Sequence, residues 1–221
     1  MSMTGSIGAS GSEEGRTRRL VGGGKIGAMT IGPGDFELTT DELRVVARYA
    51  AESAQEVLPV FENVSPGDPR PRAAVDAAWE FVNGARRTRL QRVTSLDAHR
   101  AAKEAVTEAG RLAARAAGDA ASAAYLHPIA KATQVGHILR AAACAARVAE
   151  LKAGDDPDAG LQLIEQARQR ATPILIDVLR RYPGAPTGKS RVAQLMAILD
   201  ASLRGSGDPL RPGTTEARER A

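Results

Sequence analysis

Three histidines are the first candidates for chemistry in this sequence, because an imidazole can transfer protons or bind a metal ion near neutral pH. They are His99, His127 and His137. Zinc sites favour close pairs, such as two histidines four residues apart on one helix. His127 and His137 are ten residues apart and share a helix face only if the helix continues regularly past Pro128. We expect no metal site. The three side chains are candidates for ligand binding, His99 and His137 also for acid–base catalysis, and the alternative is separate histidines satisfied at helix contacts.

A carboxylate and two guanidinium groups lie close together in a proline-rich segment, as Asp68, Arg70 and Arg72. In a rigid turn these groups can clamp helix ends, or they can bind an acidic partner through paired hydrogen bonds. The structural alternative, which we favour, is that Asp68 caps the helix that follows it. Trp79, farther along that helix, is a further candidate for binding.

Two glycine-containing motifs resemble nucleotide-binding loops but lack the context that such loops need. Gly22, Gly24 and Gly27 have the spacing of a dinucleotide-binding fingerprint, which requires a strand before it and a helix after it. Neither is predicted. The segment from Gly184 to Ser190 has three residues between its glycines, where a phosphate-binding loop has four. We therefore expect a loop and a helix start near Ser190, and no cofactor.

The elements that position these residues are predicted to be helices. Alanine, the best helix former, makes up about a fifth of the 221 residues, whereas aromatic residues make up 3 %. Thr39 and Glu42 form a capping-box pattern, and an apolar stripe of helical period follows as far as Phe61. The apolar segment 174–179 is expected to be helical, since a single strand would have no partner.

Further helices are predicted over residues 71–83, 88–117, 119–151, 157–171 and 190–203, with a short helical segment that ends at Tyr182. Gly118 is expected to end one helix, Asp119 to cap the next, and Pro128 to kink it. These elements predict an all-α fold, a single alanine-rich bundle of six or seven helices over residues 36–204. Residues 1–35 and 205–221 are expected to be disordered tails, because their composition buries too little apolar surface. Phe36 is expected to pack back on the domain.

Composition restricts the location and the partners of the chain. The single cysteine, Cys144, excludes an intrachain disulfide and fits a reducing compartment. The sequence shows no signal peptide and no stretch of about 20 apolar residues, so we expect a cytoplasmic protein with no membrane partner. The formal net charge is +4, but the arginines interleave with acids and no stacking aromatics accompany them. Nucleic acid is therefore not an expected partner.

A family resemblance extends from about Leu38 to Leu151. It rests on several short runs, namely LTTDELR at 38–44, EVL at 56–58, FE at 61–62, PGDPRPR at 66–72, AHRAA at 98–102 and QVGHIL at 134–139 with its alanine tail. Together they resemble family five of the immunity proteins from bacterial polymorphic-toxin systems. The resemblance implies an α-helical protein that binds and neutralises a toxin, and it carries over no enzymatic residue. The family tends to have an acidic residue where Ala85 stands and an arginine where Trp79 stands.

Two functional hypotheses follow. The first is an immunity-type binding protein that occludes a toxin with a helical face, and for it we expect no enzymatic activity. The alternative is a small-molecule-binding protein or an enzyme, for example in a biosynthetic or self-resistance pathway, with a pocket between helices lined by Trp79, His99 and His137. A pocket on which these histidines and Arg72 converge favours the alternative. An exposed apolar patch favours the first hypothesis.

Overall fold

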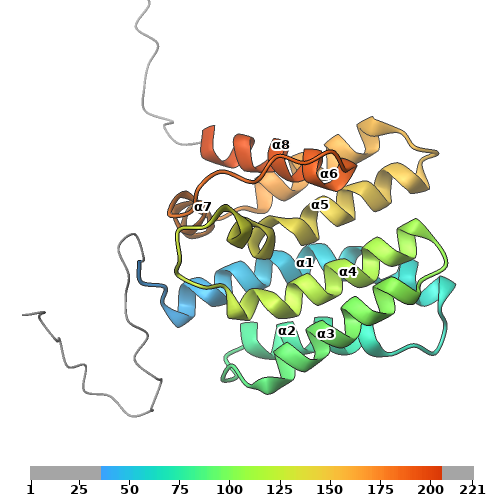
Figure 1. The fold of residues 1–221 in the computed structure, drawn as a ribbon, viewed down its shortest axis with the longest axis horizontal. Helices are drawn as coiled ribbons and strands as arrows, with labels where there is room; N and C mark the ends of the chain where they lie inside the picture. The colour runs from blue at the N-terminus through green and yellow to red at the C-terminus, as the bar shows by residue number, and fades with distance from the viewer. Residues whose placement is uncertain (1–35, 206–221) are drawn as a thin grey trace, which may run out of the picture. The chain divides into compact units, whose positions relative to one another are not determined.

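The computed structural model describes residues 36–205, and within this range the chain forms helices and no strand (Figure 1). The prediction of an all-α fold is confirmed, with eight α-helices in this range instead of the six or seven expected. The α-helices are α1 (Thr40–Val64), α2 (Arg70–Val82), α3 (Arg89–Glu104), α4 (Glu108–Ser122), α5 (Val135–Lys152), α6 (Pro157–Arg170), α7 (Pro173–Arg180) and α8 (Arg191–Gly205). Two short 3₁₀ helices, η1 (Ala123–Tyr125) and η2 (Ala132–Gln134), lie between α4 and α5.

Three helices, α1, α4 and α5, contact one another and form the centre of the bundle. Helices α2 and α3 pack on one side of these three, and α6, α7 and α8 pack on the other (Figure 1). Alanine is the most frequent buried residue, and larger side chains such as Leu58, Phe61 and Phe81 fill the spaces between helices. Small side chains let helix axes approach closely, so that polar groups on neighbouring helices also come within bonding distance.

Several helices begin where their capping residues predict. Thr39 and Glu42 form the expected capping box at the start of α1, and each side chain accepts a hydrogen bond from the other residue's backbone N–H. Asp156 caps α6, which begins with a proline, and Ser190 accepts a hydrogen bond from Ala193 N at the start of α8. The apolar segment 174–179 is helical, as expected, and belongs to α7.

The predicted helix over residues 88–117 is wrong, because the chain forms two helices there. Ala105 and Thr107 have extended backbone angles, and the Thr107 side chain accepts a hydrogen bond of 3.1 Å from Gly110 N. Thr107 is therefore the N-cap of a new helix, α4. Because α3 and α4 pack against each other, residues that would have been far apart on one long helix become neighbours.

The expected boundary at Gly118 and Asp119 is also wrong. Both residues lie inside α4, and both are buried. The helix predicted over 119–151 is instead the end of α4, the two 3₁₀ helices, and α5. Pro128 lies in the loop between the 3₁₀ helices, where its carbonyl accepts the backbone N–H of Phe36. Phe36 packs back on the domain as expected, with its ring centroid 4.9 Å from that of Tyr182.

The expected tails and the Gly22, Gly24 and Gly27 motif lie outside the described residues, apart from Gly205, which ends α8. The domain boundaries therefore remain a prediction. None of the described helices is both long enough and apolar enough to cross a membrane.

Candidate functional site

An ion pair between a buried carboxylate and a half-buried guanidinium links α4 to α5 next to His99 of α3. The Asp119 side chain is 1 % exposed, and Arg140 donates to its two oxygens from Nε and Nη2 at 2.8 and 2.6 Å. His99 Nε2 lies 3.6 Å from Oδ1 of the same carboxylate. A buried carboxylate needs such partners, because an unpaired charge in a helical core is strongly unfavourable. Three helices thus meet at one acidic side chain.

Two glycines make room for this cluster. A Cβ at Gly118 would lie 2.9 Å from the His99 ring, and a Cβ at Gly136 would lie 2.8 Å from Nη1 of Arg140. The carbonyl of Gly118 also accepts a hydrogen bond of 2.8 Å from the Ser95 hydroxyl of α3. Gly118 is therefore the point of close approach between α3 and α4. The absence of a side chain there lets the imidazole reach Asp119.

His137 joins the same region from α5. Its Nδ1 lies 3.0 Å from Oγ of Ser122, and that hydroxyl donates to the Asp119 carbonyl at 2.9 Å. A hydroxyl has one proton to donate, so Nδ1 of His137 must carry the proton of the first bond. His99 and His137 are thus both attached to the Asp119 region, one through its carboxylate and the other through Ser122.

Burial dominates the electrostatics of these groups. Desolvation lowers the pKa of His99 and of His137, and the Arg140 guanidinium lowers both further, while the Asp119 carboxylate opposes the shift. The hydrogen bonds to Asp119 raise the pKa of Arg140. Burial also raises the pKa of Cys144 to about 12, so this thiol stays protonated and packs in the core.

Ser122, His137 and Asp119 are the residue types of a hydrolytic triad, but their contacts are different. The Ser122 hydroxyl donates to a helix carbonyl, and Arg140 engages both oxygens of Asp119. In a triad, the base accepts the serine proton and the carboxylate orients the base. Over residues 36–205, no group of three or more His, Cys, Asp or Glu side chains is arranged to hold a metal ion.

The group of Asp68, Arg70 and Arg72 joins the ends of three helices. Arg70 donates to both oxygens of Asp68, at 2.9 Å from Nε and 2.7 Å from Nη2, and it also pairs with Glu104 at the end of α3. Arg72 pairs with Glu62 near the end of α1 at 2.8 and 2.9 Å. Asp68 also accepts the first backbone N–H of α2, and its hydrogen bonds from Arg70 lower its pKa. Clamping of helix ends is therefore what these contacts do within the chain.

Trp79 and His127 lie away from the two groups just described. The indole N–H of Trp79 donates to Gln55 of α1 at 2.6 Å, and the Arg48 guanidinium stacks over its ring. His127 is exposed in the loop between the 3₁₀ helices, where its backbone carbonyl accepts the Tyr182 hydroxyl. Of the three predicted histidines, only His99 and His137 are brought together in one cluster, and among the other predicted site residues Asp68 and Arg70 bond to each other.

The outer face of α3 carries an exposed apolar stripe. The inner face is buried through residues at helical spacing, namely Gln91, Thr94, Ser95, Ala98, Ala101 and Ala102. Leu90, Val93 and Leu96 point outward and are 42, 39 and 51 % exposed, and Val106 just beyond the helix is 84 % exposed. Seven large apolar side chains are exposed in the described part of the chain, and these four belong to one segment. The other three, Leu161, Ile174 and Ile198, lie on three different helices, so among the described residues the segment from Leu90 to Val106 holds the largest group of exposed apolar side chains.

Basic side chains flank this stripe. Within residues 36–205, Arg89, Arg92 and Lys103 have no carboxylate within 4 Å, whereas Arg100 pairs with Asp97 at 2.6 Å. Unpaired cations beside exposed apolar groups are suited to a partner surface that is apolar at its centre and acidic at its rim. We name the surface formed by Leu90, Val93, Leu96 and Val106 with these unpaired cations the α3 face.

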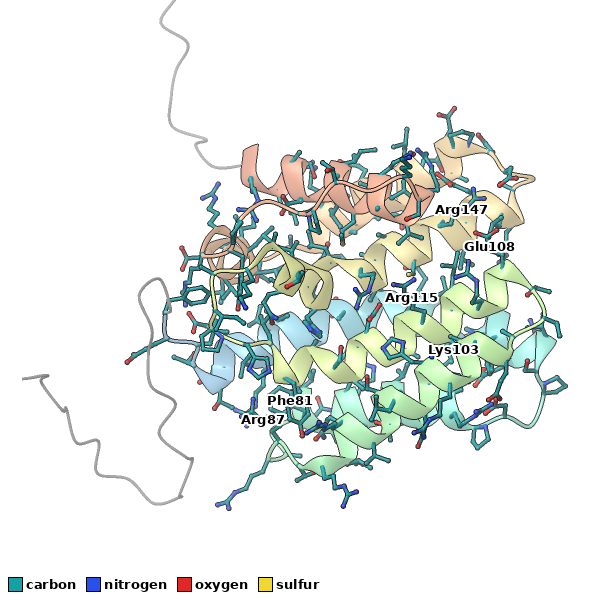
Figure 2. All side chains as sticks on the ribbon, viewed as in Figure 1. Phe81, Arg87, Lys103, Glu108, Arg115 and Arg147 are labelled. Carbon is teal, nitrogen blue, oxygen red and sulfur yellow. The ribbon has the colours of Figure 1, made fainter. Side chains whose placement is uncertain are left out.

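The sequence interpretation missed the importance of Asp119, Lys103 and Arg115. The sequence predicts Asp119 only as a helix cap. The available signal was Thr107 followed by Glu108, a good N-cap and first-turn pair that marks a helix start inside an alanine-rich run. A helix start at Thr107 predicts that α3 and α4 are separate helices that can pack against each other. Lys103 and Arg115 then lie on the same side of the domain, where Figure 2 labels them.

Comparison with known families gives one match. A family model described as "Imm-5 like putative immunity protein" matches residues 37–174, more than half of the chain. The match contains α1 to α6, and so both the α3 face and the Asp119 cluster. Searches among curated proteins and among solved structures gave no significant match. The resemblance of residues 38–151 is thereby confirmed and extended: the chain belongs to the Imm-5-like family of immunity proteins.

Proposed function

We propose that this chain is an immunity protein that neutralises a toxin by binding it through the α3 face. Membership of the Imm-5-like family supports a toxin as the partner class. The single observation that carries the choice of surface is the gathering of four of the seven exposed large apolar side chains in the segment from Leu90 to Val106. Such a patch is the usual centre of a protein interface.

Neutralisation would occur by steric occlusion, which requires no catalytic group. Apolar anchors at the centre of the face would supply most of the affinity, and the unpaired cations at its rim would steer an acidic partner surface toward it. The cation-flanked stripe therefore favours a toxin with acidic residues around an apolar depression. We propose that this happens in the cytoplasm, as the single cysteine suggests.

The alternative, a ligand pocket built from His99, His137, Arg72 and Trp79, receives less support from the contacts. Arg72 pairs with Glu62, and Trp79 is bonded to Gln55, both on α1 and apart from the histidines. The contacts of the Asp119 cluster hold helices together and activate no nucleophile. An exposed face for a protein partner is the better explanation of this surface.

The experiment is a growth assay in a bacterial host that expresses a toxin domain encoded beside the gene for this chain. The arms are the toxin alone, and the toxin with the wild type, with Leu96→Asp, or with Leu161→Asp. Leu161 is a matched control because it is 41 % exposed on α6, against 51 % for Leu96. We expect protection by the wild type and by Leu161→Asp, and loss of protection by Leu96→Asp with an unchanged circular dichroism spectrum.

Two results would contradict the proposal in different ways. Killing in the presence of folded wild-type chain would reject immunity toward that toxin. Full protection by Leu96→Asp would leave immunity intact and reject the α3 face as the binding surface.

A further inference from the structure

A basic cleft lies beside the α3 face, where α3, α4 and α5 meet. Its volume is about 280 Å³, and its lining consists of His99, Ala102, Lys103, Arg111, Arg115 and Arg140. Every lining residue except Ala102 is basic. Figure 2 labels Lys103 on α3 and Arg115 on α4, on the side of the domain turned toward the viewer.

The charges of this cleft are not balanced by the chain itself. Lys103 and Arg115 have no carboxylate within 4 Å in the part of the chain that the structure describes, and Arg111 has only Glu108, at 3.6 Å. Asp119 is the other nearby acid, and Arg140 occupies both of its oxygens. Four cations therefore face two carboxylates, so two positive charges remain for a bound anion.

The floor of the cleft is fixed before any ligand arrives. Arg140 is held by Asp119 through Nε and Nη2, and in the described range no protein acceptor bonds to its Nη1. Gly118 and Gly136 let His99 and Arg140 lie close against α4 and α5, and Ala102 adds only a methyl group to the lining of the cleft. Because Asp119 already fixes the Arg140 guanidinium, this cation contributes positive charge without being ordered by the ligand, and three flexible cations can then close around an oxyanion.

We propose that this cleft binds a doubly charged oxyanion of the phosphate type. Lys103, Arg111 and Arg115 would be its principal ligands, and Arg140 would be a fixed positive charge at the floor of the cleft. A dianion matches the two uncompensated positive charges. The volume is several times the roughly 30 Å³ share of one water molecule, so it accommodates a phosphate group with a small substituent. The cleft shares Lys103 with the α3 face, but this proposal does not rest on toxin binding and is tested without any toxin.

His99 provides a reporter inside the cleft. Its burial lowers its pKa first of all, and the charges of Arg140, Arg115 and Lys103 lower it further. A bound dianion offsets those charges, so the pKa of His99 should rise when the site is filled. By linkage, phosphate should then bind more tightly as His99 becomes protonated.

The experiment is a titration of the full chain with inorganic phosphate at constant ionic strength, followed through the imidazole carbon–proton signals of its three histidines. A His99→Gln variant assigns the reporter signal. The variants compared are Lys103→Gln/Arg115→Gln and, as a matched control, Arg89→Gln/Arg92→Gln, which removes two unpaired charges of the same face outside the cleft. Glycerol 3-phosphate replaces phosphate in a second arm.

We expect a saturable shift of the His99 signal, an elevated pKa of His99 at saturation, and an affinity at least about 10-fold lower in the Lys103/Arg115 variant. The Arg89/Arg92 variant should bind as the wild type does. Tighter binding of glycerol 3-phosphate than of phosphate identifies a phosphate ester as the preferred ligand, and the reverse identifies the free ion. Absence of a saturable shift in both arms, or equal affinity in the two double variants, would overturn the proposal.

Discussion

At the scale of single residues, three buried carboxylates of the described chain are each held by an arginine. Asp119 binds Arg140, Glu150 binds Arg191 and Arg147, and Asp200 binds Arg204. Burying charges costs more than most pairs recover, so such pairs specify geometry more than they add net stability. The first pair fixes α4 to α5 and the second fixes α5 to α8, which sets the register of helices whose alanine surfaces could slide.

Removing the carboxylate of the central pair should therefore be costly. Asp119→Ala leaves the Arg140 guanidinium without its partner, and we expect it to lower the free energy of unfolding by about 3 kcal/mol. The matched control is Asp97→Ala, which breaks the exposed pair with Arg100 and should cost less than about 1 kcal/mol. Urea unfolding followed by circular dichroism measures both. Equal losses in the two variants would show that burial of the pair does not matter.

The two half-buried histidines, His99 and His137, predict a pH dependence of stability. Burial lowers the pKa of His99 and His137 below the ordinary value of about 6.5, so below that pH the unfolded chain binds more protons than the folded chain. The free energy of unfolding should be constant from about pH 8 to 7 and should fall as the pH drops below about 6.5. The lowered pKa of Asp68 adds a separate loss, at more acidic pH.

The check is a series of urea unfolding curves between pH 8 and 5 for the wild type and for His99→Gln/His137→Gln. The double variant should lose most of the decline near pH 6. If the decline persists unchanged in the variant, other groups produce it and the assignment to these histidines is wrong.

At the scale of elements, the contact between α3 and α4 depends on Gly118. Glycine inside a helix is unfavourable by about 1 kcal/mol relative to alanine, yet α4 keeps it at a buried position. The reason lies on the other helix, since the His99 ring occupies the space that a methyl group would take. Helix propensity is here secondary to the packing of one imidazole.

This explanation predicts a reversal of sign. Gly118→Ala should destabilise the wild type by about 1 kcal/mol, because overpacking outweighs the gain in helix propensity. In a His99→Ala background the same change should stabilise the chain by up to about 1 kcal/mol. Urea unfolding of the four proteins gives the coupling energy. A coupling near zero would mean that Gly118 is present for some other reason.

Whether a helix boundary could be predicted depended on the residues that mark it. Residues that cap through their own side chains, such as Thr39 and Asp156, are visible in the sequence, and those starts were predicted. The break at 105–107 contains no proline or glycine, so an alanine-rich pattern concealed it. Gly118 and Asp119 looked like a stop signal because their real function, room for His99 and a partner for Arg140, comes from other helices. The proximity of His99 and His137 depends on the break at 105–107 between α3 and α4, so it could not be predicted from the spacing of the histidines alone.

At the scale of the whole described domain, the α3 face differs from the other exposed apolar sites in its unpaired charge. A groove of about 500 Å³ between α1 and α7 contains the exposed Ile174, but its three acids are all paired, Asp41 with Arg44 and both Glu42 and Asp177 with Arg181. On the α3 face, Arg89 and Arg92 have no such partner among the described residues. The long-range attraction of an acidic partner should therefore favour α3 over α7.

The most direct test is the dissociation constant of the complex between this chain and the toxin domain that it protects against, measured by isothermal titration calorimetry. The variants are Val93→Asp/Leu96→Asp on the α3 face and Leu161→Asp/Ile174→Asp on α6 and α7. The account predicts that the first variant binds at least about 30-fold more weakly, as expected for central interface residues, while the second binds like the wild type. Wild-type affinity in the α3 variant, with weakened binding in the α6 and α7 variant, would contradict it.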